Sequence, residues 1–311
     1  MNMAQQHTLK FLLLTGAVLY IAMAAIFGYS FEQGPNNRNV TIDARVNITN
    51  APPIVLNVII NGGATNITLN AGSQKRIECN ATVLDYNGGS TVENVTAQFF
   101  ASGTSWNSSD DNNTHYTNAT CSLGNYDAYT RNVSCGFNVQ YHTNAGAWRC
   151  NVTAIDPYSF NNASKNQSNY NTTFIDALLA LNVTQMIDYG DLATGDLSAA
   201  QQANVTNLGN RNINISVRGF GNASFLPDGI GMYCEISNIP VYYQKFNLIG
   251  GADIAQYTNL TNTSRQITGL TVLQQTNDSQ QVINSTNWVL FVPPGPFGRC
   301  NGTIVFQAES S

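Results

Sequence analysis

The sequence has little charge. Only 10% of its 311 residues are Asp, Glu, Lys or Arg, just four of them are lysines, and the formal net charge is −5. A protein that binds nucleic acid needs clustered Lys and Arg to neutralise phosphates, so this composition argues against nucleic acid as a partner. Solubility must come from uncharged polar side chains.

The motifs of familiar enzyme and metal sites are also missing. The chain contains no nucleophile elbow, no phosphate-binding glycine loop and no His-Glu-x-x-His sequence, and no two cysteines have Cys-x-x-Cys spacing. The three histidines, His7, His115 and His142, are scattered along the chain. We therefore expect a non-enzymatic protein without a cofactor, and no zinc site.

Asparagine supplies the missing polarity. The chain has 42 Asn residues, and 22 of them begin an Asn-x-Ser/Thr triplet without Pro in the middle. Random placement would give about seven, so the excess indicates acceptor sites for N-glycans on an exposed surface. The alternative is that an Asn- and Thr-rich β composition produces the triplets by accident.

The N-terminus predicts export. The stretch from Phe11 to Phe31 follows Lys10 and carries no charge itself. It is long and apolar enough to enter a membrane. Ala22-Met23-Ala24 resembles a cleavage site, so residues 1–31 are either a signal peptide or an anchor helix. Either reading places the rest of the chain outside the cell or on its surface, attached to the membrane if the segment is retained.

Beyond this segment the sequence predicts an all-β fold. Short alternating stretches are separated by Gly and Asn turns, and long helix-period stretches are missing. We expect a polar stalk at 32–53, a β-sandwich at 54–157, a glycosylated Asn/Ser-rich linker at 158–173 and a second β-sandwich at 174–311. The linker is expected because its polar side chains offer little apolar surface to bury.

The triplets agree with the alternation. In the stretch from Arg76 to Val83, the residues Ile77, Cys79 and Val83 share one face while the acceptor Asn80 lies on the other. The same rule applies in five further strands and adds the acceptors Asn94, Asn132, Asn151, Asn214 and Asn301. The expected linker contributes Asn162, Asn166 and Asn171. An acceptor must not point into a core, so the agreement supports glycosylation.

The six cysteines fit an exported protein with disulfides. Sequence alone allows fifteen connectivities. Placement on inward strand faces and division into halves favour three bridges: Cys79–Cys150 between packed sheets, Cys121–Cys135 across a hairpin, and Cys234–Cys300 in the second half.

One polar loop carries two other candidate sites. In "SSDDNNTHYTN", Asp110 and Asp111 offer the hard oxygen ligands that calcium prefers, although the ligand spacing of a calcium loop is missing. A solvated loop explains the same residues. The aromatics Trp106 and Tyr116 flank these acids, and Tyr126 and Tyr129 follow, so the region could also stack against sugars.

The second half resembles a β-sandwich module of secreted archaeal surface proteins. The matching motifs are Leu192 to Asp196, Asn207 to Asn210, Trp288 to Pro293 and Gly302 to Phe306. The first half resembles an immunoglobulin-type sandwich through Cys79, Trp148 and Cys150, although Trp148 stands where Tyr is usual. The resemblance implies an immunoglobulin-like fold and a cell-surface location, and no chemistry.

These observations favour a non-enzymatic surface glycoprotein with a structural or adhesive role. Its partners would be other surface proteins, glycans, or the membrane through an uncleaved helix. Two alternatives stay open. The chain could be a self-assembling subunit of an extracellular filament or lattice, or it could bind carbohydrate through the region from Asp110 to Tyr129.

Overall fold

The computed structural model describes residues 41–155 and 166–311, and this part of the chain is all-β, as expected. Residues 50–311 form one compact unit. Within the other unit, residues 41–49 are described as exposed chain without regular secondary structure. The apolar segment 11–31 lies outside the described residues. No helix in the described ranges is long and apolar enough to cross a bilayer.

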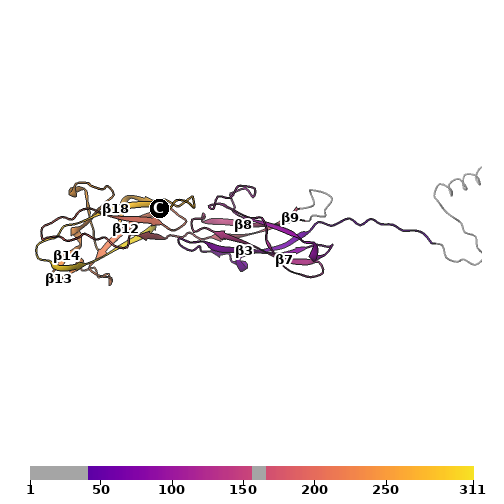
Figure 1. The fold of residues 1–311 in the computed structure, drawn as a ribbon, viewed down its shortest axis with the longest axis horizontal. Coiled ribbons are helices and arrows are strands. Elements are labelled where there is room, and N and C mark those ends of the chain that lie inside the picture. The colour runs from indigo at the N-terminus through magenta and orange to yellow at the C-terminus, as the bar shows by residue number, and fades with distance from the viewer. Residues whose placement is uncertain (1–40, 156–165) are drawn as a thin grey trace, which may run out of the picture. The chain divides into compact units, whose positions relative to one another are not determined.

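The first half builds two sheets. Its strands are β1 (Ile54–Ile60), β2 (Asn66–Ile67), β3 (Lys75–Leu84), β4 (Asn94–Ala101), β5 (His115–Asn118), β6 (Ser122–Tyr126), β7 (Thr130–Val139), β8 (Gly146–Ile155) and β9 (Asn166–Ile175). One sheet has the order β1-β3-β7-β6 and the other β2-β9-β8-β4-β5. All described pairings here are antiparallel except β2 with β9. We call residues 54–175 the N-terminal module (Figure 1).

The core of the N-terminal module follows the predicted alternation. On β3, Ile77, Cys79 and Val83 are all buried, and their neighbours on the opposite face are not. The inward residues of β4, β7 and β8 are likewise buried, and they join one hydrophobic cluster drawn from both sheets. Trp148 at its centre stacks on Phe99, with 4.8 Å between ring centroids. The two sheets therefore pack face to face.

The expected linker is wrong for residues 166–173. They belong to β9, which pairs with β8 from Asn166 opposite Ile155 to Ile175 opposite Gly146. This strand is held by polar contacts rather than by a continuous apolar face: the amides of Asn169 and Asn171 donate to backbone carbonyls of β1. Thr173 is buried and donates to Ala64 O at 2.9 Å. The remaining linker residues, 158–165, lie outside the described part.

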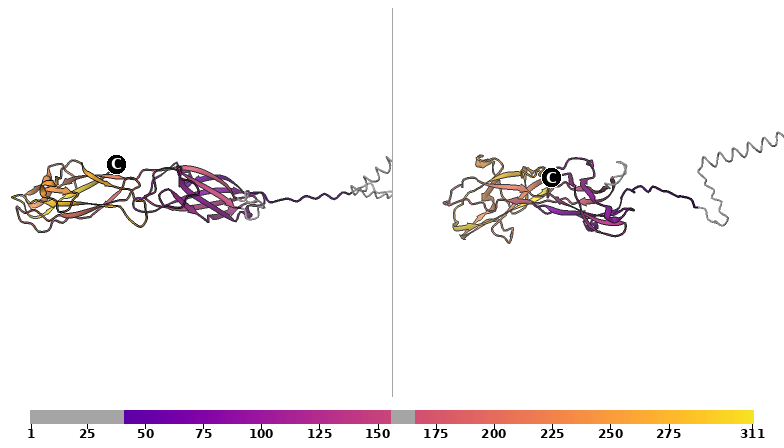
Figure 2. Two further views of the ribbon diagram at one scale, coloured as in Figure 1. Left: turned by 90° about the horizontal axis from the view of Figure 1, so that it is seen from above. Right: turned by 45° about the vertical axis from the view of Figure 1, so that its right-hand side comes forward.

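The second half contains β10 (Leu181–Val183), β11 (Gln201–Asn207), β12 (Ile213–Phe220), β13 (Ile230–Ile236), β14 (Asn238–Pro240), β15 (Gln244–Asn247), β16 (Thr258–Asn259), β17 (Arg265–Val272), β18 (Ile283–Leu290), β19 (Phe297–Asn301) and β20 (Thr303–Ser310). Its three sheets have the orders β10-β11-β18-β15-β16, β17-β12-β20 and β14-β13-β19. We call residues 181–310 the C-terminal module. Both views of Figure 2 show its strands as a group separate from those of the N-terminal module.

The second core is covered less completely than the first. Ile213, Ile215 and Val217 of β12 are buried, and so is Trp288 of β18. Ile304 and Phe306 of β20 point to the same cluster, as the alternation predicts, but both are only half-buried. The sequence pattern gives the direction in which a side chain points. It does not say whether another strand covers it.

Candidate functional site

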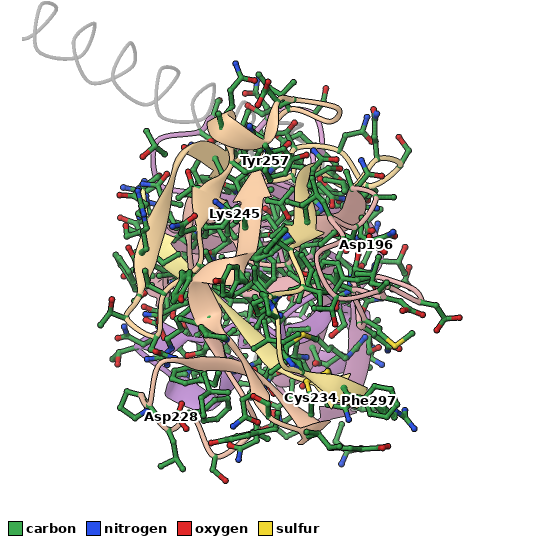
Figure 3. The ribbon with its side chains drawn as sticks, turned by 90° about the vertical axis from the view of Figure 1, so that its left-hand side faces the viewer. Asp196, Asp228, Cys234, Lys245, Tyr257 and Phe297 are labelled. Atoms are coloured by element: carbon green, nitrogen blue, oxygen red, sulfur yellow. A yellow bond between two sulfur atoms is a disulfide. The ribbon has the colours of Figure 1, made fainter. Side chains whose placement is uncertain are left out.

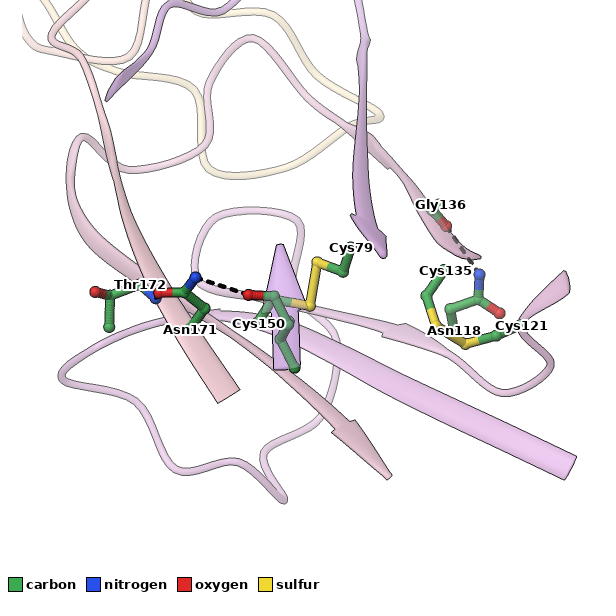
Figure 4. The surroundings of a disulfide bond; sticks show 9 residues. Cys79, Asn118, Cys121, Cys135, Gly136, Cys150, Asn171 and Thr172 are labelled. Atoms are coloured by element: carbon green, nitrogen blue, oxygen red, sulfur yellow. Dashed lines mark hydrogen bonds between the residues drawn. A yellow bond between two sulfur atoms is a disulfide. The ribbon is translucent and has the colours of Figure 1, made fainter. Parts of the chain in front are cut away.

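The three disulfides join the pairs favoured by the sequence. Cys79 of β3 and Cys150 of β8 bond across the two sheets of the N-terminal module, and Cys121 bonds Cys135 beside the β6–β7 hairpin (Figure 4). Cys234 and Cys300 are partners on neighbouring strands of one sheet, and both pack against the second core, as expected, although they are only half-buried. Phe297, which is labelled with Cys234 in Figure 3, lies opposite Ile236 on the same pair of strands, and its ring is exposed.

The acceptor asparagines of the predicted glycosylation sites lie on solvent-facing positions wherever side chains are described. Asn94, Asn132, Asn171 and Asn301 are exposed, and Asn80, Asn151 and Asn214 are partly exposed. The side chains of Asn162 and Asn166 lie outside the described part. Glycosylation of these residues remains a prediction, and the residues have the exposure it requires, although the Asn171 amide nitrogen donates to Val58 O at 2.7 Å.

A hollow of about 350 Å³ lies among β1, β3, β6 and β7, and two acceptors line it. Asn80 and Asn132 contribute to its wall together with Ile59 and Leu123. Thr82 in the same wall donates to the side-chain oxygen of Asn132 at 3.1 Å. Glycans on these two asparagines would stand over the hollow, so we do not assign it a small-molecule ligand.

The acidic loop satisfies its own carboxylates. Asp110 accepts hydrogen bonds from His115 and from the backbone and hydroxyl of Thr117. Asp111 accepts from the backbone amides of Asn113, Thr114 and His115 and from the Thr114 hydroxyl. Burial raises the pKa of Asp111, but these hydrogen bonds outweigh burial and hold the pKa below its usual value.

The loop donors therefore account for both carboxylates suggested as calcium ligands. Within the described residues, no group of three His, Cys, Asp or Glu side chains converges as metal ligands would. Calcium binding by Asp110 and Asp111 stays a prediction.

The aromatic cluster suggested for sugar binding is split. Tyr116 is only 6% exposed and its ring lies 6.2 Å from that of Trp148, so it belongs to the core and cannot stack on a ligand. Trp106, Tyr126 and Tyr129 are exposed. The ring of Tyr126 already lies under the Arg131 guanidinium, 5.5 Å from its centroid.

A buried polar network joins the two modules, and we call it the junction. From the N-terminal module it takes residues 112–116 and 140–144, and from the C-terminal module residues 274–278, which follow β17. The junction side chains of Asn113, Tyr141, His142, Thr143 and Gln275 are buried. None of these side chains stands out in the sequence as a candidate for this role.

Glutamine and asparagine amides carry most of the contacts across the junction. Asn113 Nδ2 donates to His142 O at 3.0 Å and to Gln275 O at 3.1 Å. Gln274 Nε2 donates to His142 O at 2.6 Å and to Asn144 Oδ1 at 2.8 Å. The Tyr141 hydroxyl donates to the side-chain oxygen of Gln275. Each buried amide is thus paired, which avoids the cost of burying an unsatisfied polar group.

Two tyrosines extend the network into the first core. Burial raises the pKa of Tyr116 to about 12, so its hydroxyl stays protonated and donates to Asn112 O at 2.6 Å. Burial, aided by the negative charge of Asp278, also raises the pKa of Tyr141. Trp148 Nε1 donates to Asn144 O at 2.8 Å. The junction is therefore attached directly to the aromatic centre of the N-terminal module.

Asp278 closes the junction on its solvent side. Its carboxylate accepts from His142 Nε2 at 2.8 Å, from Gln140 Nε2 at 3.2 Å and from the amide of Asn112. The imidazole of His142 is fully buried and its Nδ1 has no hydrogen-bond partner in the described residues. Asp278 is therefore the main polar partner of this ring.

Replacing Asp278 should loosen the junction selectively. We expect Asp278→Ala to weaken the contact between the modules by about 1–2 kcal/mol, because the buried His142 loses its carboxylate. Hydrogen exchange should accelerate in residues 140–144 and 274–278 and stay unchanged in β3 and β7. The exposed Asp191, changed to Ala, is the matched control. Equal exchange in both variants would show that Asp278 does not hold the junction.

No family model matches the chain, and no curated protein matches it. Among solved structures, a CsuC–CsuE chaperone–tip adhesion subunit pre-assembly complex from Csu pili of Acinetobacter baumannii is similar at 10% identity and a TM-score of 0.36, covering 79% of this chain and 97% of that one. A chaperone–tip adhesin complex of CFA/I fimbriae is similar at 9% identity and a TM-score of 0.32, and the match covers 84% of each chain. The C-terminal domain of the AgI/II polypeptide BspA from Streptococcus agalactiae is similar at 10% identity and a TM-score of 0.23. The match covers 84% of this chain and 96% of that one. At these TM-scores the similarities carry no argument about function or assembly.

Proposed function

We propose that the chain is a non-enzymatic extracellular or cell-surface protein with a structural or adhesive role. The observation that carries the proposal is the solvent-facing position of every described acceptor in the predicted glycosylation set. Three disulfides that use all six cysteines support it, because such bonds persist in oxidising compartments. In this proposal, residues 11–31 export the chain or anchor it, and glycans cover the polar strand faces.

We further propose that each module is an immunoglobulin-like domain. By position in the sheets, β1-β3-β7-β6 corresponds to the immunoglobulin strands A-B-E-D, and β9-β8-β4-β5 to G-F-C with one added strand. The Cys79–Cys150 bond then occupies the position of the B–F bridge. In immunoglobulin domains the large core Trp is on strand C, which corresponds to β4. Here β4 carries Phe99, and the Trp that stacks on it, Trp148, is on β8.

The same correspondence applies to the C-terminal module. By position in the sheets, β10-β11-β18-β15 take the places of A-B-E-D, and β20-β12-β17 take those of F, C and the added strand, although β17 follows β15 in the chain whereas β5 precedes β6. The resemblance to archaeal surface modules belongs to this half and is part of the proposal. Two domains fixed through a buried polar junction would act as a rigid spacer, which holds exposed loops away from the surface that carries them.

Peptide mass spectrometry of native material tests the proposal. We expect glycans on Asn80, Asn94 and Asn151. Asn57 and Asn87, which begin no acceptor triplet, should be unmodified and serve as internal controls. Unmodified Asn at all three acceptor positions, together with six free thiols in freshly extracted protein, would contradict an extracellular glycoprotein.

A further inference from the structure

The C-terminal module leaves one side of its core open. Within the described residues, β20 pairs only with β12, and β10 pairs only with β11. These two edge strands contact one another. The apolar side chains that these two strands turn toward the core are only partly buried: Leu181, Val183, Ile304, Phe306 and Ala308. The opening therefore exposes apolar core residues beside a strand edge with free backbone groups.

In the N-terminal module, the equivalent side of the core is covered by a strand. There β9 pairs along the whole of β8, and β1 contacts β9 from the opposing sheet. Only four hydrophobic residues beside that core are partly buried: Ala64, Ala101, Leu123 and Leu178. By strand correspondence, β20 is the equivalent of β8, and the described C-terminal module contains no equivalent of β9.

Residues 41–49 have the pattern of the missing strand. Ile42, Val46 and Ile48 are 88%, 83% and 81% exposed, although they are large and apolar. They alternate with Thr41, Asp43, Arg45, Asn47 and Thr49, so an extended backbone puts the apolar side chains on one face and the polar ones on the other. Asn47 begins an acceptor triplet and would lie on the outward face. The segment has no regular secondary structure of its own.

We propose that residues 42–48 of a second copy of this chain add to β20 as an antiparallel strand. Seven residues extend over about 24 Å, close to the length of the eight-residue β20. Ile42, Val46 and Ile48 enter the opening, and their backbone pairs with the free edge of β20. This inference concerns assembly, and it does not rest on the extracellular role or on glycosylation.

The reach of the chain excludes the same copy as donor. Ile54 pairs with Leu84 at one end of β3, whereas the junction follows Val139, which pairs with Lys75 at the other end. The ten residues of β3 separate these ends by about 30 Å. The six residue steps from Ile48 to Ile54 span at most about 22 Å. They cannot carry the segment past the N-terminal module to β20.

Donor and acceptor are different segments of one chain, so each copy can give one strand and receive another. Such a contact is heterologous and produces an open head-to-tail chain of copies unless the rotation closes a ring. Two other described edge strands are poorer acceptors. β6 is exposed and polar along most of its length, and β16 has two residues.

Sedimentation of the full chain, made without N-glycans and with its disulfides intact, tests the proposal. We expect concentration-dependent oligomers for the unchanged protein. Val46→Asp should raise the dissociation constant at least about a hundredfold, because it moves a charge into an apolar opening. Asn47→Asp adds the same charge on the outward face and should change the constant less than about threefold. Both residues lie in exposed chain, so neither variant threatens folding.

Hydrogen exchange then locates the contact. A synthetic peptide of residues 40–49, added to the Val46→Asp chain, should protect the amides of β20, and the same peptide carrying Asp at position 46 should not. Oligomers that persist in Val46→Asp, a chain that stays monomeric at every concentration, or protection at an edge other than β20 would each overturn the proposal.

Discussion

Removing the Cys79–Cys150 bond should destabilise the N-terminal module by about 4 kcal/mol. The bond closes a loop with a sequence separation of 71, and the chain-entropy estimate for such a loop is about 4 kcal/mol. It also joins the two sheets at fully buried positions, so nothing else replaces the cross-link. We expect the double variant Cys79→Ala/Cys150→Ala to unfold at a much lower urea concentration.

The measurement is urea-dependent hydrogen exchange in β3, β7 and β8, which follows the N-terminal module separately from the C-terminal one. Cys121→Ala/Cys135→Ala is the matched control, because its separation of 14 predicts a smaller loss of about 3 kcal/mol. Exchange in β12 and β18 should not change in either variant. If the longer loop gave the smaller loss, the cross-core bond would not be the main constraint on this module.

Trp148→Ala should cost about 4 kcal/mol, within the usual range of 3–5 kcal/mol for removing a buried aromatic side chain. Trp148 is fully buried, stacks on Phe99 and donates its indole hydrogen to Asn144 O. The variant removes that donor as well as the ring. Asn144 also accepts from Gln274 of the C-terminal module, so residues 140–144 should open together with the core.

Thermal unfolding monitored by near-UV circular dichroism, with hydrogen exchange at the junction, measures both effects. Trp106→Ala is the control, because Trp106 is 60% exposed and its loss should cost less than about 0.5 kcal/mol. Trp148→Phe keeps part of the stacking but loses the hydrogen bond, and it should fall between them. A Trp148→Ala protein as stable as the Trp106→Ala protein would contradict the assignment of Trp148 to the centre of the core.

The strands with regular alternation could be predicted from the sequence, since β3, β4, β7 and β8 bury the residues that their period of two assigns inward. The strand β9 could not. Its Asn and Thr side chains satisfy backbone groups of β1 and of the segment before β2, and composition does not reveal such contacts. A polar stretch of this kind looks like a linker until its partner strand is known.

The junction could not be predicted for a related reason. Asn112 and Asp278 are 166 positions apart, and each lies in an irregular segment with no period to read. Tyr116 shows the same limit, because its neighbours on the chain are polar and only the fold reveals that it packs against Trp148. The sequence located the cysteine pairs correctly because inward strand positions restrict which sulfurs can meet.

The bond between β3 and β8 also determines how the protein responds to a pull. Tension applied through residues 41–53 first loads β1, which is held to β3 by lateral pairing. Beyond Cys79 the force passes through the sulfur bridge to Cys150 and bypasses the intervening chain. The chain between Cys79 and Cys150, which would extend to about 240 Å when fully stretched, is therefore not pulled out. The part of the tether between Cys79 and Cys150 cannot lengthen while the bond is intact, and a reducing environment would make it extensible.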